Sequence, residues 1–296
     1  MKHALITGAN GFLGYSLCRG MRADGWRVTG SSRTPEKGHT QADAWMRFEL
    51  DGGNADALLD ASRPDIVIHA AALAARGACE ANPSLAMRIN AHATAELGAS
   101  CAARGLPVFF ISTDLVFDGR AATYREGDTV SPASAYGESK AEAERLLMQA
   151  HPGSYVLRCS LMYGSAADGS PGSFLSWNVG KPRRGEAVQL YANQYRRPLF
   201  APDVARVILA LRTVEAEAGI YHCAGPDRLS RAEMGAILAR HFDLPSALLQ
   251  SITLPREDDT SLCTGKVEAA TGVVFTGFEE GIASMRGVGD AGASRG

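Results

Sequence analysis

The 296-residue chain is long enough for one large domain, or for a core domain with a smaller annex. Hydrophobic residues make up 46% and charged residues 21% of it, which excludes a disordered or fibrous protein. The 30 Lys and Arg residues nearly balance the 32 Asp and Glu residues, and a net charge of −2 offers no bulk basic field to nucleic acid or an anionic membrane.

Short apolar runs alternate with longer helical patterns through the first 160 residues. The predicted strands are Ala4–Thr7, Arg27–Ser31, Ile66–His69, Val108–Ser112 and Tyr155–Cys159. The helical patterns between them cover roughly 12–24, 54–61, 82–104 and 134–150. This alternation predicts βαβ units with right-handed crossovers, and hence an α/β fold with a doubly wound parallel sheet of the Rossmann type.

The pattern changes after residue 163. A stretch rich in Gly, Ser, Ala and Pro at 164–172 predicts a loop, and helices are expected at about 203–213 and 230–241. The second helix opens with a capping box, Ser230-Arg231-Ala232-Glu233. We expect a Rossmann domain over 1–163, a small C-terminal substrate-binding lobe over 164–286 with some segments returning to the core, and a disordered tail over 287–296.

Six cysteines are spread along the chain without a C-x-x-C pair. This spacing predicts no zinc or redox motif, so we expect reduced core thiols in a cytoplasmic protein and no metal. No apolar stretch approaches the roughly 18 residues of a membrane span, and the N-terminus lacks the pattern of a signal peptide. His69 and His222 are expected to be structural.

Three glycines follow the first predicted strand with the spacing G-x-x-G-x-x-G, in the segment Gly8-Ala9-Asn10-Gly11-Phe12-Leu13-Gly14. The first allows a tight turn, the second lets the backbone approach a pyrophosphate, and the third lets the helix pack close to the strand. The N-terminus of that helix adds free N–H donors and a positive partial charge. The segment therefore predicts a dinucleotide-binding turn.

The end of the second predicted strand indicates which dinucleotide is bound. A carboxylate at this point would hold the ribose 2′-hydroxyl of NAD. This chain has Ser31, Ser32 and Arg33 there instead. A hydroxyl and a guanidinium suit a 2′-phosphate, because arginine can bond it bidentately. We therefore predict NADP(H) in preference to NAD(H).

Tyr136 and Lys140 lie four residues apart in the helix predicted over 134–150, so they share one face. We expect the ammonium of Lys140 to favour the phenolate and to lower the pKa of Tyr136, which makes the tyrosine a proton donor or acceptor nearer neutral pH. Thr113 follows the strand Val108–Ser112 and brings a hydroxyl to the carboxyl edge of the sheet, where doubly wound folds bind ligands.

These elements together resemble the short-chain dehydrogenase/reductase superfamily, in its extended, nucleotide-sugar-modifying branch. The matching segments are Thr7–Gly14, His69-Ala70-Ala71-Ala72, Asn90, Ser112-Thr113 and Tyr136-x-x-x-Lys140. Within that branch the chain is most similar to the dTDP-4-dehydrorhamnose reductases, through Ser112–Gly119 and through Ser261–Lys266 followed by Gly272. The resemblance covers about residues 3–285.

The resemblance implies roles for individual residues. Tyr136 would protonate the oxygen formed from a ketone, Lys140 would tune Tyr136 and hold the nicotinamide ribose, and Thr113 would hydrogen-bond the reacting oxygen. Asp51 would reach the adenine amine. The full set of implied cofactor-binding residues is Gly8, Asn10, Gly11, Phe12, Leu13, Gly14, Ser32, Arg33, Asp51, Ala70, Ala71, Ala72, Asn90, Tyr136 and Lys140.

The chain also departs from that family. Leu115 stands where the family has an aromatic residue, and Arg158-Cys159-Ser160-Leu161 lacks the family's tryptophan, which leaves the sugar open. The related dehydratases carry Thr-Asp-Glu, so Thr113-Asp114-Leu115 disfavours dehydration. Epimerases of this branch usually keep an acidic residue where this chain has Ser32 and Arg33.

Basic and aromatic residues gather in the second half and suit a nucleotide sugar, whose diphosphate and base need charge and flat surfaces. They are Trp177, Lys181, Arg183, Arg184, Tyr191, Tyr195, Arg196 and Arg197, with Phe174 and Asn178 nearby. We predict Asp114, Asn178 and Arg197 as substrate-binding residues, and favour Arg197 among the cations because Pro198 fixes its direction. The sequence leaves a monomer and a homodimer both open.

The leading hypothesis is an NADPH-dependent reductase that acts on a keto group of a nucleotide-activated deoxysugar. An epimerase on the same fold is the first alternative. A non-catalytic regulatory subunit that keeps the fold, as in methionine adenosyltransferase, is the second. The joint presence of Thr113, Tyr136 and Lys140 favours catalysis.

Overall fold

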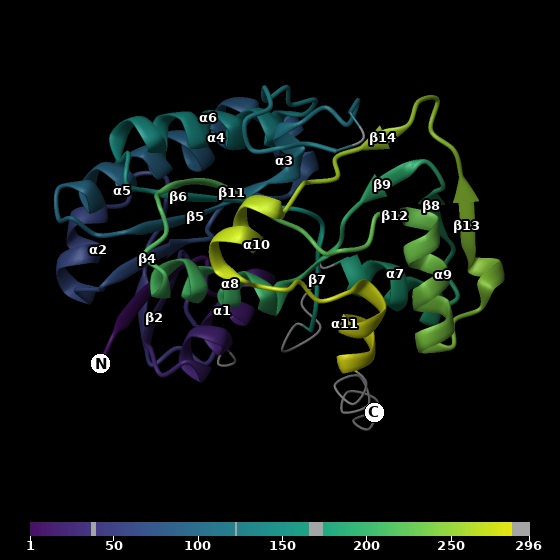
Figure 1. The fold of residues 1–296 in the computed structure, drawn as a ribbon, viewed down its shortest axis with the longest axis horizontal. Helices are drawn as coiled ribbons and strands as arrows, with labels where there is room; N and C mark the ends of the chain where they lie inside the picture. The colour runs from purple at the N-terminus through teal and green to yellow at the C-terminus, as the bar shows by residue number, and fades with distance from the viewer. Residues whose placement is uncertain (37–39, 122, 166–173, 286–296) are drawn as a thin grey trace.

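The computed structural model describes residues 1–36, 40–121, 123–165 and 174–285. In these residues a seven-stranded sheet has the order β11-β6-β5-β4-β1-β2-β3, and every neighbouring pair is parallel (Figure 1). Its strands are β1 (His3–Thr7), β2 (Arg27–Ser32), β3 (Ala44–Arg47), β4 (Ile66–His69), β5 (Val108–Thr113), β6 (Tyr155–Cys159) and β11 (Gly219–Cys223). The doubly wound α/β prediction is confirmed.

Two layers of helices cover the sheet, as Figure 1 shows with α5 and α6 above it and α1 and α8 below it. One layer holds α1 (Phe12–Ala23), α8 (Ala201–Thr213) and α10 (Gly265–Thr271), and the other holds α2 (Ala55–Ser62), α5 (Ala93–Ala102) and α6 (Ala135–Ala150). The helices α3 (Arg76–Ala81) and α4 (Pro83–Met87) pack against α6. Because both faces are covered, every residue of β4 and β5 is buried, which explains their continuous apolar sequences.

The five predicted strands match β1, β2, β4, β5 and β6 to within one residue at each end. Two strands of this sheet were not predicted. The edge strand β3 is only four residues long and partly buried, and its three apolar residues are too few to indicate a strand. The strand β11 comes from the second half of the chain and extends the sheet beside β6.

The single helix predicted over 82–104 is three consecutive segments. A π-helical turn over Arg88–His92 separates α4 from α5. Asn90 lies in this π-helical turn and is buried, and π-helical turns often occur at functional sites.

A smaller lobe lies beside the sheet, to the right in Figure 1. Its elements are α7 (Phe174–Arg183), α9 (Arg231–Phe242), α11 (Phe278–Ser284), β7 (Met162–Tyr163), β8 (Val188–Tyr191), β9 (Gln194–Arg196), β10 (Leu199–Phe200), β12 (Leu229–Ser230), β13 (Leu249–Ile252) and β14 (Asp258–Asp259). A short 3-10 turn at Ser246–Leu248 lies between α9 and β13, and another at Asp114–Val116 follows β5. The lobe has its own apolar cluster, which includes Val179, Leu238 and Ile282. The predicted capping box opens α9, since Ser230 and Glu233 bond each other's backbone N–H groups at 3.1 and 2.7 Å.

Part of the loop predicted at 164–172 and all of the tail predicted over 287–296 lie outside the described residues. All six cysteines are free thiols, and five of them are buried. In the described part of the chain, no helix combines the length and apolarity needed to cross a membrane, and no group of side chains could hold a metal ion.

Candidate active site

A cavity of about 1180 Å³ lies between the carboxyl edge of the sheet and the lobe. The ends of β1, β2, β5 and β6 line it, together with the N-terminus of α1 and residues of α7, β8 and α9. The sheet order reverses at β1, which is the place where doubly wound folds bind ligands. The volume exceeds the roughly 300–1,000 Å³ of pockets for a single small ligand, so a dinucleotide and a second molecule can share it.

The glycine turn forms one end of the cavity, and close packing requires its glycines. Gly8 has φ of +73°, and a Cβ there would lie 2.7 Å from the Ala71 backbone nitrogen. A Cβ at Gly14 would lie 2.3 Å from the Gly8 carbonyl oxygen. A Cβ at Gly11 would meet only that same oxygen, at 3.2 Å, so the backbone of the turn stays open to the cavity. With the N-terminus of α1 beside it, the turn fits a pyrophosphate.

The loop after β2 is held against the glycine turn. The Asn10 amide nitrogen lies 2.9 Å from the Ser32 hydroxyl and 2.8 Å from the Pro35 carbonyl oxygen. The Ser32 hydroxyl in turn donates to the Thr34 carbonyl at 2.7 Å. Arg33 is exposed and lines the mouth of the cavity. Asn10 therefore sets the position of this loop. The exposed side chain of Arg33 can contact a ligand at the mouth of the cavity.

The other predicted cofactor residues line the cavity with one exception. Phe12, Leu13 and Ala70–Ala72 line it directly, and so does Asp51, which pairs with Arg88 at 3.1 Å on the surface. The exception is Asn90.

Asn90 lies behind the cavity wall. Its amide nitrogen donates to the Leu73 carbonyl at 3.1 Å and to the Ser139 hydroxyl at 2.9 Å, and its oxygen accepts the Leu73 N–H at 2.7 Å. Leu73 itself lines the cavity. Asn90 thus fixes a wall segment against α6 and makes no direct contact with the cavity.

His69 sits in a buried hydrogen-bond chain below the glycine turn. Thr94 donates its hydroxyl to the Asn90 carbonyl at 2.7 Å, so it accepts from Nε2–H of His69 at 2.9 Å. The other ring nitrogen, Nδ1, then accepts the Thr7 hydroxyl at 2.7 Å. Thr7 also accepts the Ala71 N–H at 3.2 Å. These hydrogen bonds hold the segment after β4 in place, which agrees with a structural role for His69.

Two buried histidines make the stability of the fold depend on pH. Burial lowers the pKa of His69 and of His222 to about 3. The unfolded chain takes up these protons near its ordinary pKa of 6.5, so stability is expected to fall as the pH drops below about 6.5, by up to ~1.4 kcal/mol per pH unit for each histidine. Urea unfolding at about pH 7 and about pH 5 measures the slope. His222→Gln should remove its share, and an unchanged slope in that variant contradicts the assignment.

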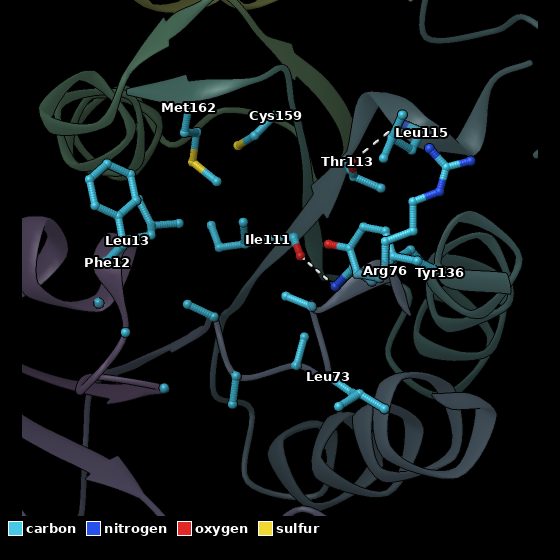
Figure 2. Close-up of a pocket in the computed structure, with 18 of the residues that line it drawn as sticks. Phe12, Leu13, Leu73, Arg76, Ile111, Thr113, Leu115, Tyr136, Cys159 and Met162 are labelled. Atoms are coloured by element: carbon cyan, nitrogen blue, oxygen red, sulfur yellow. Dashed lines mark hydrogen bonds between the residues drawn. The ribbon is translucent and has the colours of Figure 1, made fainter. Parts of the chain in front are cut away.

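The predicted catalytic residues converge on the middle of the cavity, where Thr113, Tyr136 and Lys140 all line it. Figure 2 shows Tyr136 beside the Ile111 carbonyl, which accepts a hydrogen bond from Nζ of Lys140 at 2.7 Å. The Lys140 ammonium also lies 3.9 Å from the centre of the Phe110 ring. Thr113 ends β5, and its hydroxyl oxygen accepts the Leu115 N–H and donates to the Asp114 carboxylate, both at 3.2 Å.

The expected effect of Lys140 on Tyr136 is corrected by the structure. Burial raises the pKa of Tyr136 above its usual value of 10, and the charge of Asp114 adds to the rise. Burial also lowers the pKa of Lys140, to about 7, although Glu144 opposes this shift. The lysine directs its ammonium to the Ile111 carbonyl and to Phe110, so it does not favour the phenolate. Tyr136 is therefore a neutral phenol that keeps its proton at neutral pH.

Asp114 lines the cavity beside Thr113, and its carboxylate is held from the lobe side. Thr260 donates to Oδ2 at 2.6 Å, and Nε of Arg196 lies 3.4 Å from the same oxygen. Arg196 also pairs with Asp258 at 3.1 Å. These contacts tie the end of β5 to β9 and β14, so Asp114 connects the sheet to the lobe.

The lobe presents only some of the predicted substrate residues to the cavity. Phe174, Trp177, Asn178, Tyr191 and Arg196 line it; Lys181, Arg183, Arg184 and Tyr195 do not. The buried Asn178 amide donates to the Phe174 carbonyl at 2.7 Å.

Arg197 is turned away from the cavity. Its guanidinium donates to the Leu262 carbonyl at 2.7 Å and to the Pro226 carbonyl at 3.4 Å, and it does not line the cavity. The direction of the Arg197 side chain before Pro198 is fixed, as predicted, but the side chain points toward the Leu262 and Pro226 carbonyls. Arg231 occupies the place expected for a cation. The sequence marked this residue only as part of the capping box.

Comparison with known proteins identifies the family. The model of the family described as RmlD substrate binding domain matches residues 1–287. The chain belongs to this family. The family is of the nucleotide-sugar reductase type, as the sequence resemblance indicated.

Two curated relatives of this RmlD substrate binding domain protein are similarly close. Methionine adenosyltransferase 2 subunit beta of Xenopus laevis is 32% identical over 260 residues, which cover 85% of this chain and 75% of the relative. The probable low-salt glycan biosynthesis reductase Agl14 of Haloferax volcanii is 32% identical over 252 residues, with 84% and 83% covered. A crystal structure of dTDP-4-dehydrorhamnose reductase from Bacillus anthracis in complex with NADP shares the fold, at a TM-score of 0.82 and 21% identity over 96% and 98% of the chains.

A buried ion pair behind the catalytic residues was not found from the sequence of this RmlD-family chain. Arg158 of β6 and Glu144 of α6 approach to 2.7 Å, and their side chains are only 3% and 5% exposed. Ser112 donates its hydroxyl to the same carboxylate. Glu144 follows Lys140 by one helical turn, so the pair joins β5, β6 and α6 directly under the site.

Proposed function

We propose that the protein reduces a keto group on a nucleotide-activated deoxysugar, with NADPH as the hydride donor. The observation that carries the proposal is the convergence of Thr113, Tyr136 and Lys140 with the glycine turn on a single cavity. A 32% identical relative is named as a glycan biosynthesis reductase, and a structure with the same fold is described in complex with NADP. Both names agree with this chemistry.

The cofactor would lie along the glycine turn, with its adenosine end near Ser32, Arg33 and Asp51 and its nicotinamide end near Lys140. When bound, it supplies a hydride. Thr113 positions the keto oxygen of the substrate by hydrogen bonding. The neutral Tyr136 phenol holds its proton until that oxygen becomes basic, and then donates it. Its raised pKa keeps the proton in place at neutral pH.

The direct test follows NADPH absorbance with a panel of 4-keto nucleotide sugars. We expect steady NADPH oxidation with at least one of them. Tightly bound NAD that copurifies, with no net oxidation, would contradict the reductase and indicate an epimerase.

A subunit role is the second candidate, favoured by the 32% identity to a methionine adenosyltransferase subunit. This role needs no proton donor, whereas the chain brings all three reductase side chains to the cavity. Absence of turnover with every substrate, together with a methionine adenosyltransferase retained in a pull-down, would favour the subunit role over the reductase.

Arg33→Ala tests the cofactor preference. Arg33 is exposed at the cavity mouth, so its loss should not disturb the fold. Because only NADPH has a 2′-phosphate, we expect Arg33→Ala to lower the affinity for NADPH about tenfold and to change the affinity for NADH little. A tenfold loss corresponds to one charge-assisted hydrogen bond to the phosphate. Titration of both cofactors into the wild type and the variant measures this. Equal losses would show that Arg33 does not contact the phosphate.

A further inference from the structure

Arg231 is a cation of the cavity wall without a carboxylate partner among the described residues. It is the first residue of α9, and its side chain lines the lobe end of the cavity. Its Nε donates to the neutral Gln194 amide oxygen at 3.1 Å, and the guanidinium lies 5.4 Å from the centre of the Phe174 ring. These contacts fix the direction of the side chain without an ion pair, while the carboxylate charges of Asp114 and Asp258 act on the guanidinium from a greater distance.

Arg196, the neighbouring cation, is already neutralised. It is about 5% exposed and pairs with Asp114 and Asp258. Its charge, after burial, is the second cause that lowers the pKa of Arg231, to about 10, so Arg231 remains protonated at neutral pH. The two guanidinium groups repel each other, and the carboxylates of Asp114 and Asp258 partly offset this repulsion. Among the described residues only Arg196 forms ion pairs with these carboxylates, so the guanidinium of Arg231 can still pair with an anion in the cavity.

We propose that Arg231 binds a phosphate group of the nucleotide part of the substrate, while Arg196 connects the lobe to the sheet. This inference rests on the proposed function. The planar fork of arginine matches phosphate oxygens, and Nη1 and Nη2 remain available once Nε is bonded to Gln194.

The position along the cavity agrees with a phosphate. The keto group belongs at Tyr136 on the sheet side, whereas Arg231 lies on the lobe side with Trp177 and Tyr191. Trp177 is 58% exposed; Nζ of Lys181 lies over one face of its ring, 3.7 Å from the ring centre, and the other face can stack on a base. A nucleoside diphosphate sugar carries its phosphates next to the base, so a cation on the lobe side of the cavity, with these aromatic residues, suits a phosphate.

Calorimetric titration of the full chain with dTDP, UDP and the parent nucleosides tests the assignment. We expect Arg231→Gln to weaken binding of a nucleoside diphosphate at least tenfold and to leave the nucleoside unchanged. Arg231→Lys should restore part of the loss, because it keeps the charge but not the fork. The affinity of Arg231→Gln should also depend less on salt. Arg240→Gln is the matched control, since Arg240 lies on the same helix and is 62% exposed near its far end.

Each outcome separates this inference from the proposed function, because the titration needs neither cofactor nor turnover. Equal diphosphate affinity in the wild type and Arg231→Gln overturns the inference, even if the wild type oxidises NADPH. An equal loss for diphosphate and nucleoside also overturns it, since Arg231 would then only shape the lobe. Failure of the wild type to bind any nucleoside diphosphate overturns it as well. Diphosphate binding that depends on Arg231, in a protein without reductase turnover, supports the inference and contradicts the reductase.

Discussion

Tyr136→Phe is expected to lower turnover by about 100- to 10,000-fold while leaving the affinity for the cofactor nearly unchanged. The variant keeps the ring and removes only the proton donor. Among the described residues the phenol makes no hydrogen bond to the protein, so its loss should not unfold the site. The measurement is kcat for NADPH oxidation, with cofactor affinity measured in parallel.

The pattern of the two readouts decides the role of Tyr136. Near-normal turnover would remove it from the mechanism. Loss of turnover together with loss of cofactor affinity would show that the hydroxyl serves binding. Only a selective fall in kcat agrees with a tyrosine that gives its proton in the rate-determining chemistry.

Arg158→Leu is expected to lower the free energy of unfolding by about 3–5 kcal/mol, because it leaves the Glu144 carboxylate buried without its partner. The double variant Arg158→Leu with Glu144→Leu should recover much of this loss, since it leaves no unpaired charge. Urea unfolding of the two variants and the wild type measures both effects.

An exposed pair on the same helix supplies the control. Arg145 and Glu142 are 2.6 Å apart, but their side chains are 52% and 31% exposed. Arg145→Leu should therefore cost less than about 1 kcal/mol. Equal losses of unfolding free energy for Arg145→Leu and Arg158→Leu would show that the buried pair contributes no more to stability than the exposed pair.

The elements that the sequence predicted well are marked by a pattern of neighbouring residues along the chain. β4 and β5 are apolar along their whole length because helices cover both faces, and the glycine turn follows β1 at a fixed spacing. Tyr136 and Lys140 share a face because they are one helical turn apart. These features need no knowledge of the rest of the fold.

The features that were missed depend on contacts between distant segments. Arg196 is held by carboxylates from residues 114 and 258, and Arg197 is held by the carbonyl of residue 262. Arg231 is held instead by the side chain of Gln194. The pKa of Tyr136 was predicted from its neighbour along the helix, but burial by the whole cavity wall is the larger cause. Local spacing cannot reveal either effect.

The path of the chain limits how the lobe can move. After β6 the chain builds α7, β8 and β9, returns to the sheet as α8 and β11, builds β12, α9, β13 and β14, and crosses again through α10 to α11. The sheet and the lobe are therefore joined by several crossings of the described chain rather than by one linker. A ligand that contacts both the sheet and the lobe would therefore stabilise the whole chain against denaturation. A fragment that stops at residue 163 would lack β11, so the edge of β6 would be exposed and the fragment would tend to aggregate.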